Sequence, residues 1–82
     1  MLNAVPIVLD DIYVPVKRRQ TLDSARVEEL AEDIIDNGLT TPIQVRRDKE
    51  RYVLVEGLHR LEAARALGEP TIEALIVSPR QH

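Results

Sequence analysis

The clearest pattern along the chain is an amphipathic helix over residues 22–39. Its apolar residues recur at helical spacing and leave the acidic residues on the other side: Val27, Leu30, Ala31, Ile34 and Ile35. Asp23 is placed to cap the free amides at the start of this helix. Asn37 and Gly38 are suited to the left-handed conformation that ends a helix. The sequence therefore predicts a helix with both ends marked.

Two neighbouring segments predict a β-hairpin. Residues 43–47 alternate between apolar and polar side chains, with Ile43 and Val45 expected to point inward. A polar turn at 48–50 leads into a second strand over residues 51–56. The short connection predicts that the two strands pair with each other.

The remaining segments complete an α+β pattern. Residues 5–14 indicate a strand and its exit, and 71–77 indicate a further strand, whereas 15–23 have no periodicity and predict a loop. A second helix is expected over residues 57–68, followed by a break in the chain. The order of strand, helix, strand, strand, helix and strand predicts a small α+β domain with a mixed β-sheet and two main helices.

The length of 82 residues predicts a single domain over 1–82, with its core at about 5–77 and a frayed tail at 78–82. The core must be aliphatic, because the only aromatic residues are Tyr13 and Tyr52. The absence of cysteine excludes disulfides, thiolate metal sites and a cysteine nucleophile.

The charge distribution constrains the partners. A net charge of -3 argues against a domain that holds DNA by bulk electrostatics. The acidic residues gather on the 22–39 helix, however, while most basic residues lie elsewhere, so a local basic surface remains compatible with the total. We expect no membrane partner and a cytoplasmic protein, because no apolar run is long enough to span a bilayer and the start lacks the features of a signal peptide.

The best chemical clue is the stretch "VEGLHRLEAARALG" at residues 55–68. A strand that runs through Gly57 into a helix directs the unpaired amides of that helix outward at the end of a sheet. His59 and Arg60 stand in the first turn, where basic residues oppose the helix dipole unless they share a bound anion. Arg60 offers a bidentate fork to phosphate oxygens. The alternative is an ordinary helix whose Arg60 reaches solvent or a nearby carboxylate.

Three blocks in order resemble the ParB/sulfiredoxin superfamily, and the resemblance runs from about residue 7 to residue 77. The first block, an arginine-containing loop that leads into a helix, is "RQTLDSARVEELAEDIIDNG". The second, "GLTTPIQVR", matches the family pattern G-[IL]-x-x-P-[IL]-x-V-R. The third block, which contains "GLHRLEAA", matches G-x-[RH]-R-x-x-A, which in this family binds nucleotide phosphates at a helix start.

The resemblance implies a pocket for a nucleoside triphosphate, ATP or CTP, with magnesium. Gly57, His59 and Arg60 would hold the phosphates. The loop of Thr40, Thr41 and Pro42 would line the opposite wall. The remaining candidates are arginines that would reach in from the side or from a strand: Arg18, Arg19 and Arg46.

Departures from the family patterns separate its branches. Sulfiredoxins have G-C-H-R, and this chain has Leu58 at the cysteine position, so thiol chemistry of that kind is excluded. The kinase-like branch has D-G-H-H-R, and Glu56 stands at its aspartate position as a candidate general base or magnesium ligand. A strand-end carboxylate that pairs with Arg60 or Lys17 is the alternative for Glu56. Partition proteins have G-E-R-R, and this chain has Leu58-His59 in place of the middle pair. This departure argues against nucleotide hydrolysis more than against nucleotide binding.

Three functions follow as hypotheses. The first is a nucleotide-binding ParB-like domain that serves as a switch or accessory module in plasmid or chromosome partition or in DNA-linked regulation. The second is a small phosphoryl-transfer enzyme or NTPase that uses Glu56 with magnesium. The third is a DNA-binding or nuclease ParB-like protein. The resemblance also implies a homodimer when nucleotide is bound, and DNA as a partner through another protein or a further domain.

Overall fold

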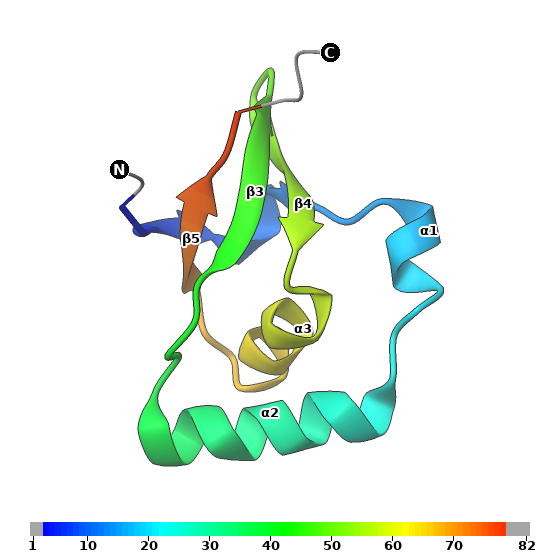
Figure 1. The fold of residues 1–82 in the computed structure, drawn as a ribbon, viewed down its shortest axis with the longest axis vertical. Helices are drawn as coiled ribbons and strands as arrows, with labels where there is room; N and C mark the ends of the chain where they lie inside the picture. Colours follow the sequence, from blue (N-terminus) through cyan, green and yellow to red (C-terminus); the bar gives the residue numbers. More distant parts are fainter. Residues whose placement is uncertain (1–2, 79–82) are drawn as a thin grey trace.

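The computed structural model describes residues 3–78, and its fold is built on a mixed sheet of five strands (Figure 1). The strands lie in the order β1-β5-β3-β4-β2. The elements in chain order are β1 (Val5–Val8), a 3-10 turn η1 (Leu9–Asp11), β2 (Ile12–Tyr13), α1 (Val16–Arg19), α2 (Ser24–Asn37), β3 (Ile43–Asp48), β4 (Arg51–Glu56), α3 (Leu58–Ala66) and β5 (Thr71–Ile76). The predicted α+β class with a mixed sheet is confirmed.

The strand pairing combines both orientations. β3 and β4 form the predicted antiparallel hairpin, with Asp48 opposite Arg51. Lys49 in the connecting turn has a φ of 59°, the left-handed conformation that tight hairpin turns require. β1 pairs antiparallel with β5, whereas β3 pairs parallel with β5 and β2 pairs parallel with β4. The hairpin extends beyond the other strands at the top of Figure 1.

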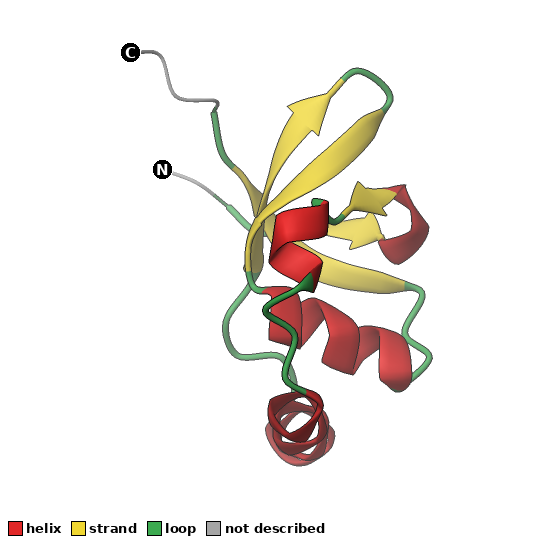
Figure 2. Ribbon diagram, turned by 90° about the vertical axis from the view of Figure 1, so that its right-hand side faces the viewer, coloured by secondary structure: helices red, strands yellow, loops and turns green. Residues whose placement is uncertain are grey.

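The two main helices stack on the same side of the sheet. α3 lies between the sheet and α2, so the fold has three layers (Figures 1 and 2). The centre of the core is Ile43 and Val45 of β3 with Leu61 of α3, all 0% exposed. The predicted inward direction of Ile43 and Val45 is therefore confirmed, and the core is aliphatic as expected.

Both ends of α2 lie where the sequence predicts them, although Gly38 has a ψ of 175° and so does not adopt the left-handed helical conformation that was expected. The Asp23 carboxylate accepts a hydrogen bond from the amide of Ala25 at 3.0 Å. Gly38 follows the helix with a φ of 76°, and its amide donates to the carbonyl of Ile34 at 2.8 Å. The predicted apolar stripe is wider than the contact that it makes, because α2 packs mainly against the single helix α3. As a result Ile35, expected in the stripe, is 68% exposed.

The structure departs from the prediction at two places near the start of the chain, by adding α1 and β2. Residues 15–23 were expected to form a loop, but α1 occupies Val16–Arg19 after Pro15, whose φ of -57° suits the start of a helix. One helical turn is too short to show a hydrophobic period. The strand and the turn predicted within 5–14 are present as β1 and η1, but the chain then forms β2 beside β4, a second strand that the sequence did not predict.

The two later elements agree with the sequence. α3 ends before Gly68, whose φ is 77°, and the amide of Glu69 donates to the carbonyl of Ala64 at 3.1 Å. β5 occupies most of the predicted strand at 71–77. The predicted tail at 78–82 lies outside the described residues apart from Ser78. No helix among residues 3–78 has the length and apolar character needed to cross a bilayer.

Candidate anion-binding site

The site is built on the junction between β4 and α3. Gly57 occupies the N-cap position of α3 with φ 105° and ψ 33°, a conformation that residues with a side chain rarely adopt. No side chain caps this helix, and its first backbone hydrogen bond runs from the amide of Leu61 to the carbonyl of Gly57 at 2.9 Å. The amides of Leu58, His59 and Arg60 therefore lack helical partners and are available to an anion.

A pocket of about 240 Å³ opens at this junction. Its lining residues come from α1, α2, the end of β4 and the start of α3, and from the chain between α1 and α2: Arg18, Thr21, Arg26, Leu30, Glu56, Gly57, Leu58, His59 and Arg60. Three elements thus each supply one arginine, so the pocket concentrates positive charge within a chain whose net charge is -3. Guanidinium groups with free amides at a helix start are groups that bind phosphate.

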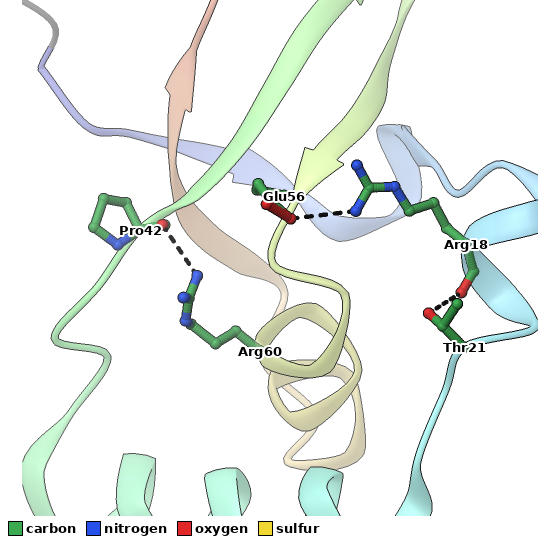
Figure 3. A network of polar contacts seen from close by, with 5 residues as sticks. All are labelled: Arg18, Thr21, Pro42, Glu56 and Arg60. Atoms are coloured by element: carbon green, nitrogen blue, oxygen red, sulfur yellow. Dashed lines mark hydrogen bonds and ion pairs between the residues drawn. The ribbon is translucent and has the colours of Figure 1, made fainter.

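Arg60 is held across the junction. Its Nη1 atom donates to the carbonyl of Pro42 at 3.4 Å, which links α3 to the residue before β3 (Figure 3). A Cβ atom on Gly57 would lie 3.1 Å from this Nη1 and 2.7 Å from Cγ2 of Ile43. A side chain at position 57 would therefore crowd both Arg60 and Ile43. Glycine is required here for steric as well as conformational reasons.

Arg18 and Arg19, both candidates from the sequence, point in different directions. Arg18 lines the pocket, and its Nη1 lies 3.2 Å from Oε1 of Glu56 (Figure 3). Arg19 points elsewhere, because its Nε donates to the carbonyl of Val14 at 3.1 Å and its guanidinium lies 5.9 Å from the centre of the Tyr13 ring. The structure thus brings Arg18, and not Arg19, to the candidate site.

His59 lines the pocket and also makes a hydrogen bond to the residue that caps α2. Its Nε2 accepts a hydrogen bond from the amide of Asp23 at 3.0 Å, which ties the start of α3 to the residue that caps α2. In the neutral ring the proton then resides on Nδ1, which is left as the donor for other groups. His59 therefore joins two helices and also lines the pocket.

The predicted threonine loop lies beside the pocket and not within it. Thr40 and Thr41 line an adjoining hollow of about 220 Å³, which shares Leu30 and Arg60 with the first one. Pro42 contributes its carbonyl to Arg60. Arg46 lies on β3 and lines neither of these two hollows.

Arg26 is a pocket residue that the sequence reasoning missed. It lies in the first turn of α2, and a signal for it existed, since it is the only basic residue in the otherwise acidic stretch 22–39. Glu56, the candidate magnesium ligand, directs one oxygen at Arg18. Within residues 3–78 no three histidine, aspartate or glutamate side chains gather as a metal site.

The family model and a curated relative both indicate a ParB N-terminal domain. The family model for the ParB N-terminal domain matches residues 3–82. A probable chromosome-partitioning protein ParB of Helicobacter pylori is 36% identical over 80 residues, which are 96% of this chain and 28% of that protein. The chain thus spans little more than a quarter of that relative.

Two solved structures share the fold. Sulfiredoxin from Arabidopsis thaliana has a TM-score of 0.83 and 35% identity, over 94% of this chain and 86% of that one. A C-terminally truncated chromosome-partitioning protein ParB from Caulobacter crescentus, complexed with CTP-gamma-S, has a TM-score of 0.82 and 23% identity. It covers 96% of this chain and 46% of that one, and at this identity the likeness shows the fold alone.

Proposed function

The chain belongs to the ParB N-terminal domain family, and on that premise we propose that it binds a nucleoside triphosphate, with the phosphates at the start of α3. The observation that carries the proposal is the convergence of Arg18, Arg26 and Arg60 on the uncapped helix start at Gly57. A phosphate group fits this donor set, because it needs several donors and compensation of its charge.

Each group has a distinct part in the proposal. The free amides after Gly57 donate to the phosphate that lies nearest the helix, where the dipole also favours negative charge. Arg60, already positioned by the carbonyl of Pro42, offers its remaining N–H groups to the phosphate oxygens. Arg18 and Arg26 approach from α1 and α2, so binding would draw three helices toward one ligand.

CTP is the nucleotide to test first, since a protein of the same fold was crystallised with CTP-gamma-S. ATP is the second choice. Magnesium, when bound with the nucleotide, would neutralise part of the phosphate charge. The thiol chemistry of sulfiredoxins is not part of the proposal, because the chain has no cysteine and carries Leu58 at the position in question.

The wider role proposed is that of a switch or accessory module in partition. The relatives of this chain include chromosome-partitioning proteins, which are much longer than it is. A second copy of the chain and DNA, reached through a further domain or another protein, are the partners included in this proposal. Nucleotide binding is the step on which these roles depend.

Isothermal titration calorimetry with CTP, ATP and GTP, each with and without magnesium, tests the proposal. We expect saturable binding of at least one triphosphate and a loss of tenfold or more in Arg60→Ala, since a charged hydrogen-bond partner contributes about 1.5–3 kcal/mol. Arg46→Ala is the matched control, because it removes an arginine that lines neither hollow. Absence of binding by every triphosphate, or equal losses in both variants, would refute the proposed site.

A further inference from the structure

The pocket contains a carboxylate that opposes the ligand proposed for it. Among the residues that the structure describes, Glu56 is the single acidic residue in the pocket lining. Its Oε1 lies 3.2 Å from Nη1 of Arg18 (Figure 3), and both residues line the pocket. Glu56 thus takes up the guanidinium that a phosphate in the pocket would need.

The Arg18–Glu56 pair is able to exchange. The side chains of Arg18 and Glu56 are 42% and 63% exposed, and an ion pair this accessible to water stabilises a protein weakly. No residue of α1 is buried. At the end of α1, Oγ1 of Thr21 donates a hydrogen bond to the backbone carbonyl of Arg18 at 2.7 Å, which leaves the Arg18 side chain free to move. Neither the ion pair nor the packing of α1 fixes the Arg18 side chain against Glu56.

We propose that Glu56 is a built-in competitor for the phosphate: it holds Arg18 in the empty pocket and gives it up when a polyphosphate binds. This inference rests on the proposed nucleotide function. The carboxylate and a phosphate bind the same guanidinium edge and repel each other at close range. A ligand must therefore bring enough negative charge to displace Glu56, and this cost lowers the affinity for every anion that uses Arg18. Because Arg18 is part of α1, a change of its partner from Glu56 to a phosphate would also act on that helix.

The competition predicts that removing the carboxylate strengthens binding. Glu56→Gln keeps the shape of the side chain and abolishes its charge, so the affinity for CTP and for inorganic tripolyphosphate should rise about three- to tenfold at low salt. The titrations are done with EDTA present, so that no metal ion contributes. Glu50→Gln is the matched control. It removes the same charge from the hairpin turn, outside the pocket, and should change the affinity by less than about twofold.

A double-mutant cycle separates competition for Arg18 from a general effect of charge. If Glu56 acts by holding Arg18, the gain from Glu56→Gln should fall below about twofold in an Arg18→Gln background. An equal gain in both backgrounds would show simple repulsion and overturn the proposal. Unchanged or weaker binding in Glu56→Gln would also overturn it.

Failure of this inference is distinguishable from failure of the proposed function. If the wild type binds CTP and Arg60→Ala does not, while Glu56→Gln has no effect, the phosphate site stands and the competition is refuted. If the wild type binds no polyphosphate but Glu56→Gln does, the carboxylate controls the pocket more strongly than proposed, and the inference is supported. If neither protein binds, both proposals fall.

Discussion

Replacing Gly57 by alanine tests the geometry of the site most sharply. The added methyl group would lie 2.7 Å from Cγ2 and 3.0 Å from Cβ of Ile43, and 3.1 Å from Nη1 of Arg60. Arg60 is a flexible side chain and is able to move away. Ile43 is 0% exposed in the core, so moving it would displace other buried side chains.

The magnitude follows from two costs. The φ of 105° places the alanine in a region that L-residues avoid, at about 1–2 kcal/mol. Overlap with a side chain in a packed core adds about 1–3 kcal/mol. The expected loss is therefore about 2–5 kcal/mol from a total stability of roughly 4–12 kcal/mol for a domain of this size. At about 4–8 °C per kcal/mol, the Tm should fall by at least about 8 °C.

Gly38→Ala and Gly68→Ala are the matched controls. Both glycines have a positive φ, 76° and 77°, and a Cβ atom at either position would have no neighbour within 4 Å. These variants should lose only the conformational cost, about 1–3 kcal/mol. Urea denaturation followed by circular dichroism measures all three variants against the wild type. If Gly57→Ala is as stable as the two control variants, the steric part of the reasoning is refuted.

Substitutions at Leu61, Asp23 and His59, with matched controls, test the packing and the helix junctions by the same denaturation assay. Leu61→Ala, at a position that is 0% exposed, should cost about 2–5 kcal/mol, whereas Ile35→Ala, 68% exposed, should stay within about 0.5 kcal/mol; similar losses would contradict the burial. Asp23→Ala removes the acceptor for the amide of Ala25 and should cost about 0.5–2 kcal/mol, while Asp23→Asn should restore most of it if capping is the reason. His59→Ala leaves the amide of Asp23 without its acceptor and should cost about 0.5–1.5 kcal/mol, and an unchanged stability would show that the junction contributes nothing.

The elements with strong local signals could be predicted from the sequence. The start of α2 follows from the side chain of Asp23, and its end follows from the backbone freedom of Gly38. Both act on residues only a few positions away. The β3–β4 hairpin follows from alternation and a short turn. α1 and β2 lack such signals, because one is a single turn and the other is a pair of residues whose structure depends on β4.

The site divides in the same way. Gly57, His59 and Arg60 are consecutive or nearly so, and the strand-to-helix junction places them together without further knowledge of the fold. The contributions of Arg18 and Arg26 depend on how α1 and α2 pack against α3, which local patterns do not determine. Local patterns also do not reveal the contacts that engage predicted phosphate-binding residues, such as the hydrogen bond from the amide of Asp23 to Nε2 of His59.

The central claim is that nucleotide phosphates bind at the uncapped start of α3, and NMR observes those amides directly. In a titration of the labelled protein with CTP, we expect the largest chemical-shift changes at the backbone amides of Leu58, His59 and Arg60. Lys49 and Glu50 in the hairpin turn, which line neither hollow, should change little. Shifts that leave the three α3 amides in place, or that centre on the hairpin, would contradict the account.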